Sequence, residues 1–124
     1  MRISRVRDIL GRWADRFFKR VLSPQETAYC QARRDPAPHV AARFAAKEAA
    51  MKALGVGWVG ASWREVEVVN APSGQPQLRV SGRAAARMAS LGATSALVSL
   101  AHDGDYAAAH VILSRNATAE HPST

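Results

Sequence analysis

The chain has 124 residues, of which 48% are hydrophobic, and a formal charge of +7 that comes from 17 Lys and Arg against 10 Asp and Glu. This length excludes two independent cores, so we predict a single domain over residues 1–115, a flexible polar tail over 116–124, and an oligomer that extends the core. The positive charge predicts a polyanionic partner, such as a phosphate-rich cofactor, an acidic protein, nucleic acid or an anionic membrane.

The single cysteine, Cys30, excludes an intramolecular disulfide and a metal site built from several cysteines. This cysteine usage fits a reducing cytoplasm. No run approaches the roughly 18 apolar residues of a membrane span, and the N-terminal residues alternate arginine with apolar side chains, unlike a signal peptide. We therefore expect a cytoplasmic protein with no membrane partner.

The first half of the chain predicts three helices. Apolar residues at helical spacing from Ile3 to Val21, with arginines between them, predict a basic amphipathic helix. The sequence Ser-Pro-Gln-Glu over 23–26 has the capping-box pattern of a second helix start. Prolines within 33–38 predict a break, and residues 40–54, rich in Ala, Lys, Glu and Met, predict a third helix that ends at Gly55.

The second half predicts strands around one further helix. Residues 64–70 and 77–80 alternate like strands, and the turn signal over 71–74 predicts that they pair as a hairpin. Residues 82–91 predict a helix, and residues 96–100 and 107–113 predict two more strands. Helices grouped early and strands grouped late predict an α+β fold with a small antiparallel sheet packed with helices.

The third predicted helix carries the residues best suited to chemistry. Glu48 and Lys52 follow Ala41 and Ala45 at three- and four-residue steps, so they share one face of the helix. A carboxylate for a hard cation and an amine for phosphate are typical of a site for a magnesium-bound diphosphate. Spacing alone, however, favours an ordinary surface ion pair between Glu48 and Lys52, worth about 0.2–0.5 kcal/mol.

Short sequence words along most of the chain resemble the holo-acyl carrier protein synthase family. The words RFAAKEA over 43–49 and KALGVG over 52–57 are similar to the signature helix and loop of that family. Upstream RF at 16–17 and SPQE at 23–26, and downstream WREVEV at 63–68, GQP at 74–76 and SLAH at 99–102, stand in the family's order. The resemblance covers residues 3–113.

The resemblance implies a 4′-phosphopantetheinyl transferase-like fold and a transferase that moves 4′-phosphopantetheine from coenzyme A to a serine of an apo-acyl carrier protein, with Mg²⁺, in support of fatty acid biosynthesis. Its implied site residues are Glu48 for magnesium, Lys52 for a coenzyme A phosphate, Arg43 and His102 for the nucleotide end, Gly55 and Gly57 for the cofactor loop, and Lys47 or a metal-bound water for the serine proton. Lys52 would also offset charge on the leaving phosphate.

The resemblance also implies partners. The family is typically a homotrimer in which each site is completed across a subunit interface. Its acyl carrier partner is acidic, so Arg5, Arg12 and Arg16 on the first helix form the expected docking surface. A solvated helix face explains each of these arginines equally well.

The sequence departs from the family at its start. Members normally open with a short apolar strand that runs into an Asp, a second magnesium ligand, and Met1 falls just after that position. Asp8 lies inside the first predicted helix and does not replace this ligand. A displaced start, a trimmed N-terminus and a degenerate relative each explain the departure, and we expect the Asp-bearing segment to increase magnesium-dependent transfer.

Two other classes of function remain open. A non-catalytic relative would bind coenzyme A or a carrier protein without forming product. A basic nucleic-acid-binding module would explain the charge through phosphate contacts, although the sequence has no recognised nucleic-acid motif.

Overall fold

The computed structural model describes residues 1–55 and 62–115. Three helices come first, namely α1 (Ile3–Val21), α2 (Pro24–Gln31) and α3 (Pro36–Leu54). They are followed by the 3₁₀ turn η1 (Trp63–Glu65), strands β1 (Val66–Asn70) and β2 (Pro76–Val80), helix α4 (Gly82–Ser90), and strands β3 (Ser95–Asp103) and β4 (Tyr106–Ser114). The predicted α+β class is confirmed. No helix in the described ranges is long and apolar enough to cross a bilayer.

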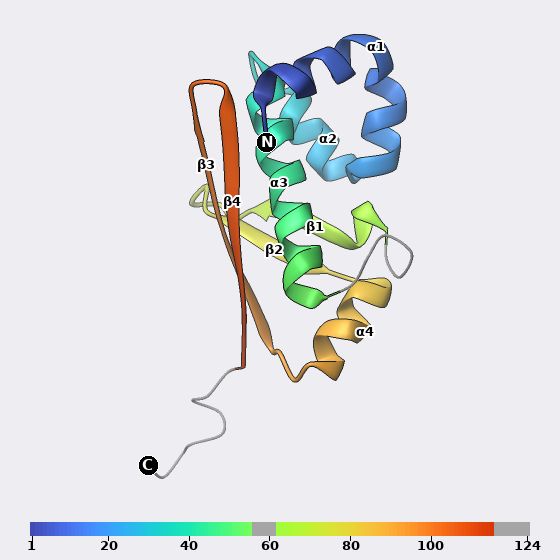
Figure 1. Ribbon diagram of the computed structural model, residues 1–124, viewed down its shortest axis with the longest axis vertical. Helices are drawn as coiled ribbons and strands as arrows, with labels where there is room; N and C mark the ends of the chain where they lie inside the picture. The colour runs from blue at the N-terminus through green and yellow to red at the C-terminus, as the bar shows by residue number, and fades with distance from the viewer. Residues whose placement is uncertain (56–61, 116–124) are drawn as a thin grey trace.

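The strands form two separate antiparallel hairpins within the described ranges, where the sequence predicted one small sheet. In the first hairpin Val68 lies opposite Leu78, and in the second Leu100 lies opposite Ala109. Strand β2 lies against β3, but no ladder of hydrogen bonds joins them. In Figure 1 the long β3–β4 hairpin runs beside α3, and the shorter β1–β2 hairpin lies behind α3.

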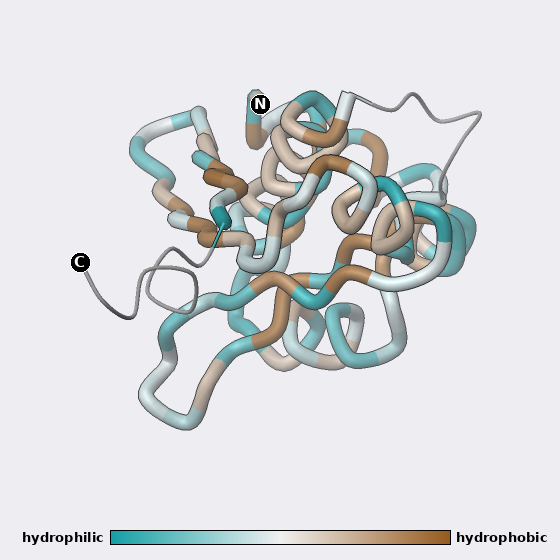
Figure 2. The backbone as a smooth tube through the Cα atoms, turned by 90° about the horizontal axis from the view of Figure 1, so that it is seen from below, coloured by the Kyte–Doolittle hydropathy of each residue, from teal (hydrophilic) through white to brown (hydrophobic). Residues whose placement is uncertain are grey.

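Helix α3 separates the core into two parts. One cluster joins α1, α2 and the first half of α3, and it includes Val6, Leu22 and Val40. The other joins the second half of α3 to β1 and α4, and it includes Leu54 and Val66. Figure 2 shows hydrophobic residues spaced along the strands with more polar residues between them, the pattern of a sheet with one face packed against helices.

The helix starts show how the local sequence sets these boundaries. The predicted capping box of α2 is confirmed, since Ser23 Oγ accepts from the backbone N–H of Glu26 at 3.2 Å and Glu26 Oε1 accepts from that of Ser23 at 2.9 Å. Helix α3 starts at Pro36, a turn earlier than predicted. Pro36 and Pro38 fit there because the first turn of a helix needs no backbone N–H donors.

Helix α1 is bent and is held at its start by the far hairpin. Trp13 has non-helical backbone angles, φ −135° and ψ 28°, and divides the helix into two segments. At its beginning, the backbone N–H and hydroxyl of Ser4 both donate to the Asp105 carboxylate at 2.7 Å. Asp105 lies in the turn between β3 and β4, so this contact ties that turn to the first helix.

Candidate nucleotide and metal site on helix α3

The polar side chains of α3 lie in very different environments. Lys47 is fully buried, and Arg43 is only 2% exposed. Glu48 is half-buried and Lys52 is exposed. The face of α3 that carries Arg43 and Lys47 therefore packs into the protein, and the face that carries Glu48 and Lys52 opens to solvent.

Lys47 is held by three acceptors. Its Nζ lies 2.7 Å from Glu26 Oε1 on α2, donates to the Trp63 carbonyl at 3.0 Å, and donates to the Val66 carbonyl. Glu26 Oε2 accepts in turn from the backbone N–H of Val68 at 2.8 Å. The pair therefore joins α2, α3 and β1.

This environment bears on the predicted role of Lys47 as a proton acceptor. Burial lowers the pKa of its amine, and the charge and hydrogen bond of Glu26 oppose that effect. All three donor positions of the ammonium are used by protein acceptors, and no part of the side chain is exposed. The geometry disfavours Lys47 as the group that takes a substrate proton, and it indicates a structural role.

Glu48 and Lys52 lie one turn apart on the solvent-facing side. Within residues 1–55 and 62–115 neither side chain forms a hydrogen bond or an ion pair, and the surface ion pair between them that spacing favoured is not formed. The carboxylate and the amine are therefore both available to a ligand. The described ranges contain no group of three or more His, Cys, Asp or Glu that can hold a metal, so Glu48 is a lone carboxylate.

The end of α3 is shaped by a glycine and an arginine. Gly55 has φ +70°, a left-handed conformation that glycine adopts without strain, and its N–H donates to the Lys52 carbonyl at 3.1 Å. Arg87 Nε from α4 donates to the Leu54 carbonyl at 2.8 Å. The backbone beside Lys52 is thus fixed by two contacts. Gly57, predicted for the same loop, lies outside the described residues.

Arg43 lies nearer the start of α3 in a polar and aromatic environment. One of its terminal nitrogens donates to Asn70 Oδ1 at 2.8 Å, and the other donates to the His39 carbonyl at 3.3 Å. Its guanidinium carbon lies 4.1 Å from the centre of the Tyr29 ring, and that of Arg33 lies 3.9 Å from the same ring. Arg43 Nε is buried with no partner among the described residues.

His102 lies at the same end of α3 as Arg43. It is exposed and belongs to β3, where it pairs with Ala107, and not to the turn between strands. Its ring centroid lies 6.0 Å from that of His39. Lys52 follows His39 by 13 positions, which corresponds to about 20 Å along the helix at 1.5 Å per residue. Within one chain, His102 and Lys52 are therefore at opposite ends of α3.

The structure brings together three residues that the sequence did not single out. Tyr29, His39 and Asn70 all contact Arg43 or His102. One of them had a local signal, because His39 and Arg43 stand four residues apart on α3 and so share a helix face. Asn70 had none, since its contact with α3 depends on the placement of β1.

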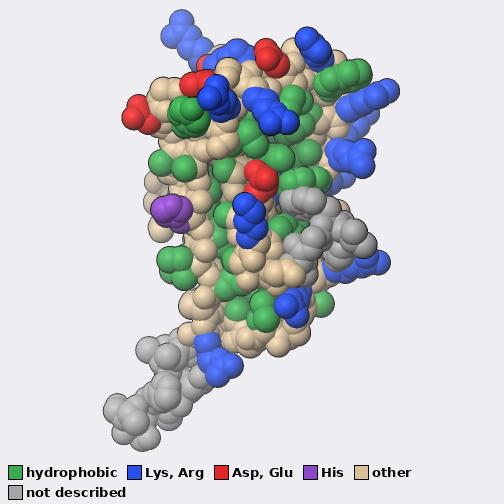
Figure 3. Space-filling model, in the orientation of Figure 1, with side chains coloured by type: hydrophobic (Ala, Val, Ile, Leu, Met, Phe, Trp, Pro, Cys, Tyr) green, Lys and Arg blue, Asp and Glu red, His purple; other side chains and the backbone are tan. Residues whose placement is uncertain are grey.

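The predicted docking arginines all lie exposed on α1. Arg5 precedes the bend at Trp13, whereas Arg12 and Arg16 flank it and line one shallow surface hollow of about 290 Å³. Trp13 is 52% exposed, and the Arg16 guanidinium lies 5.4 Å from its ring centre. Figure 3 shows Lys and Arg side chains gathered over the end of the molecule formed by α1. The surface combines positive charge with an exposed aromatic ring.

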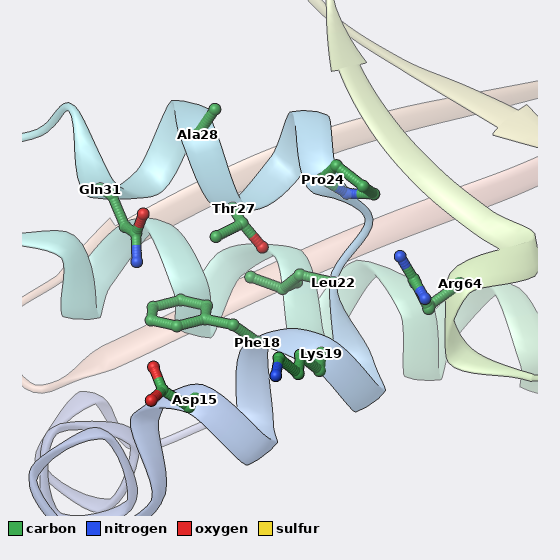
Figure 4. Close-up of a pocket in the computed structure, with 9 residues that line it drawn as sticks. All are labelled: Asp15, Phe18, Lys19, Leu22, Pro24, Thr27, Ala28, Gln31 and Arg64. Carbon is green, nitrogen blue, oxygen red and sulfur yellow. The ribbon is translucent and has the colours of Figure 1, made fainter.

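A second hollow, of about 370 Å³, lies between α1 and α2. Figure 4 shows Phe18 and Leu22 between the two helices, with Lys19 on α1 and Arg64 extending from the side of η1. None of the site residues predicted from the sequence lines it. The hollow is therefore distinct from the polar residues of α3, although it adjoins the basic helix.

The comparison with known sequences identifies a family. The pattern of the 4′-phosphopantetheinyl transferase superfamily matches residues 1–111. The holo-[acyl-carrier-protein] synthase of Nitratidesulfovibrio vulgaris strain Hildenborough is 51% identical over 112 residues, which cover 90% of each chain. That of Syntrophotalea carbinolica is 43% identical over 117 residues, covering 94% of this chain and 91% of the relative.

Solved structures of the same kind superpose on this chain. The Helicobacter pylori holo-[acyl-carrier-protein] synthase in complex with coenzyme A aligns with a TM-score of 0.80 at 30% identity, over 92% of this chain and 95% of that one. A coenzyme A complex from Chronobacterium ammoniagenes aligns with a TM-score of 0.82 at 31% identity, over 94% and 93%. The chain therefore belongs to the holo-acyl carrier protein synthase family, the transferases that move 4′-phosphopantetheine from coenzyme A to an acyl carrier protein.

Proposed function

We propose that this chain performs the family reaction with Glu48 and Lys52 as the residues that face the coenzyme A diphosphate. The observation that supports this most is the contrast on α3, where Lys47 is enclosed while Glu48 and Lys52 form no hydrogen bond or ion pair within the described residues. A carboxylate and an amine held on one helical face suit a metal-bound diphosphate. The arrangement of Gly55 and Arg87 fixes the backbone beside them.

The reaction forms a bond between the carrier serine oxygen and the β-phosphorus of coenzyme A. The bond between that phosphorus and the bridging oxygen of the diphosphate breaks, and 3′,5′-adenosine diphosphate leaves with the electron pair. Lys52 offsets the negative charge that develops on this leaving group. The serine proton passes to solvent water at the site, since Lys47 is enclosed. Such reactions depend on positioning and charge neutralisation more than on covalent help from the protein.

The residues present fit a magnesium ion that is shared with the substrate. Mg²⁺ is typically held by one or two carboxylates together with substrate phosphates and waters, and Glu48 supplies one half-buried carboxylate that is not used elsewhere in the described ranges. Magnesium, when bound, would neutralise charge on the diphosphate.

Arg43 and His102 are proposed to hold the nucleotide end. The exposed ring of His102 is available to a ligand, and Arg43, which is buried beside it, adds positive charge to this end of the site. We propose that Gly55 and Gly57 shape the loop around the rest of the cofactor.

We also propose that the protein is a homotrimer whose sites lie between subunits. The outward face of the β3–β4 hairpin pairs Leu97, 61% exposed, with Ile112, 59% exposed, which is unfavourable for a monomer. The distance of about 20 Å between His39 and Lys52 along α3 also favours a site completed by a neighbour. Sedimentation velocity tests this, and a Leu97→Asp, Ile112→Asp variant should give monomers. A monomeric parent chain would contradict the proposal.

The acyl carrier protein is proposed to dock on α1. Its acidic surface suits Arg5, Arg12 and Arg16, and Trp13 offers an apolar contact at the bend. Reversing Arg16 to Glu should raise the KM for the carrier and weaken its salt dependence, while the KM for coenzyme A stays the same. We place this reaction in the cytoplasm because Cys30 is a buried free thiol, and its product serves fatty acid biosynthesis.

Mass spectrometry of an apo-acyl carrier protein tests the proposed function. After incubation with this chain, coenzyme A and Mg²⁺, the carrier should gain one phosphopantetheine, and chelation should abolish the gain. Asp8→Asn, which removes an exposed carboxylate from α1, should react at least as well as the parent. Binding of coenzyme A with no gain of mass under any metal condition would favour the non-catalytic relative.

A further inference from the structure

The start of α3 concentrates positive charge around one histidine. His39 lies among Arg33, Arg43 and His102, and its ring is 6.1 Å from the Tyr29 ring and 6.0 Å from the His102 ring, measured between centroids. The Tyr29 ring itself has a guanidinium within about 4 Å on two sides, a cation–π arrangement. These are five groups from α2, the segment between α2 and α3, α3 itself and β3, and four of them carry or can carry positive charge.

Little negative charge opposes this cluster. The charge of Asp35 acts on His39 and raises its pKa. Its carboxylate is already paired with Arg7 through two hydrogen bonds of 2.8 and 3.1 Å. His39 also stands near the N-terminal end of α3, where the helix dipole favours an anion. The surroundings of His39 are therefore those of an anion site with no anion supplied by the protein itself.

We propose that His39 is a specificity-determining residue at the nucleotide end of the site, where with His102 it binds a nucleotide phosphate and takes up a proton on binding. This inference rests on the proposed function, because it assigns a phosphate of the same nucleotide to these rings. It adds a residue and a proton to the Arg43 and His102 assignment. Two adjacent imidazoles beside two guanidiniums can accommodate a phosphate as charged hydrogen-bond donors.

The direction of proton uptake follows from the charges. In the free protein, burial lowers the pKa of His39, and Arg43, Arg33 and His102 lower it further, while Asp35 opposes them. A phosphate placed beside the ring favours the imidazolium form and raises that pKa. Binding therefore takes up a proton, so affinity is higher at acidic pH and decreases as the pH rises through the pKa of the bound state.

The alternative is that His39 only packs against Tyr29 and His102. A packing residue affects stability, but it does not change the number of protons taken up when a ligand binds. The proton count therefore separates the two roles, and it does so without measuring activity.

Isothermal titration calorimetry provides the test, with 3′,5′-adenosine diphosphate as the probe at pH 6.0, 7.0 and 8.0 in buffers of different ionisation enthalpy. The parent should take up a measurable fraction of a proton near pH 7, and His39→Gln should take up less. Because the phosphates of the probe titrate identically in both cases, the ratio of the two affinities isolates His39. We expect the parent to bind the probe about fivefold more tightly than His39→Gln at pH 6.0, and the two affinities to become equal towards pH 8.0.

His110 supplies the matched control. It is exposed, and it pairs with Ser99 on the same hairpin as His102 but away from the cluster. His110→Gln should leave both the affinity and the proton uptake at parental values. Equal proton uptake by the parent and His39→Gln, with a constant affinity ratio across pH, would overturn the inference.

Coenzyme A itself separates this inference from the proposed function. If coenzyme A binds the parent and His39→Gln with the same pH dependence, His39 has no role in recognition and the proposed function stands. If coenzyme A binds neither protein at any pH, both fail. Dephospho-coenzyme A, which lacks the 3′-phosphate, should show the His39-dependent uptake only if the diphosphate is the group that His39 binds.

Discussion

Two acid–amine pairs lie on or against α3, and they are opposite in environment. Glu26 and Lys47 are enclosed at 2.7 Å from each other, with every remaining donor of the amine satisfied by backbone carbonyls. Glu48 and Lys52 lie on the neighbouring face without a hydrogen bond or an ion pair in the described ranges. The same residue types thus stabilise the protein in one place and remain available to a ligand in the other.

The difference shows that residue type and spacing do not decide which charged groups act on a substrate. Burial and partners decide it, because a charge that is fully satisfied inside the protein has no capacity left for a ligand. We propose that the pair that acts on the substrate is the one that the protein leaves unsatisfied.

Breaking the buried pair should have the largest effect on stability. Lys47→Met leaves the Glu26 carboxylate buried without its cation, which should lower the free energy of unfolding by about 3–5 kcal/mol. Chemical denaturation followed by circular dichroism measures it. Glu26→Gln, Lys47→Met should recover part of the loss, because no unpaired charge remains. Equal destabilisation by Lys52→Met would contradict the contrast between the pairs.

Removing the free carboxylate should reduce activity and leave stability intact. Glu48→Gln removes the charge that faces the metal, and we expect kcat/KM for carrier modification to decrease about 100-fold, equivalent to about 2.7 kcal/mol. The unfolding free energy should change by less than about 0.5 kcal/mol. Steady-state assays and denaturation on the same sample check both. An active Glu48→Gln variant would remove Glu48 from the site.

Replacing the free amine should have a smaller effect. Lys52→Met removes one cation from the diphosphate site, and we expect the Kd for coenzyme A to rise about tenfold, or about 1.4 kcal/mol. Calorimetric titration measures it. Lys19→Met, an exposed cation on α1, is the matched control and should bind coenzyme A like the parent. Equal effects of the two changes would mean that Lys52 acts only through net charge.

Cys30 reports on the buried region around Glu26 and Lys47, and its labelling is the smallest of the effects that we predict. Its side chain is fully buried on α2, and burial raises the pKa of the thiol to about 11. A thiol with this pKa is largely protonated and unreactive below pH 9. Iodoacetamide should therefore leave the native protein unlabelled at pH 8, and Lys47→Met should label faster as the region opens. Rapid labelling of the parent would contradict the enclosed environment of Glu26 and Lys47.

The sequence predicted the fold class and most elements because their signals are local. The capping box at Ser23 and Glu26 sets the start of α2, and Gly55 ends α3 as expected. The start of α3 was predicted too late, because proline disfavours a helix interior but not a first turn. The separation into two hairpins depends on how the helices pack, which no local pattern encodes.

The candidate site was predictable only in part. The words around Glu48 and Lys52 resemble the family closely enough to locate the helix, and helical spacing places Lys47 and Lys52 on different faces, but it does not say which face is buried. What separates them is Glu26, a residue 21 positions upstream of Lys47, whose contact is set by the packing of α2 on α3. The contacts of Tyr29 and Asn70 with Arg43 depend in the same way on how α2 and β1 pack against α3.

The dependence of coenzyme A affinity on magnesium tests the central claim most directly. Titrations of the parent and of Glu48→Gln with coenzyme A, each with and without Mg²⁺, should show that magnesium tightens binding to the parent and has little effect on the variant. An identical magnesium dependence in the two proteins would contradict the claim that Glu48 is the carboxylate that α3 leaves free for the metal-bound diphosphate.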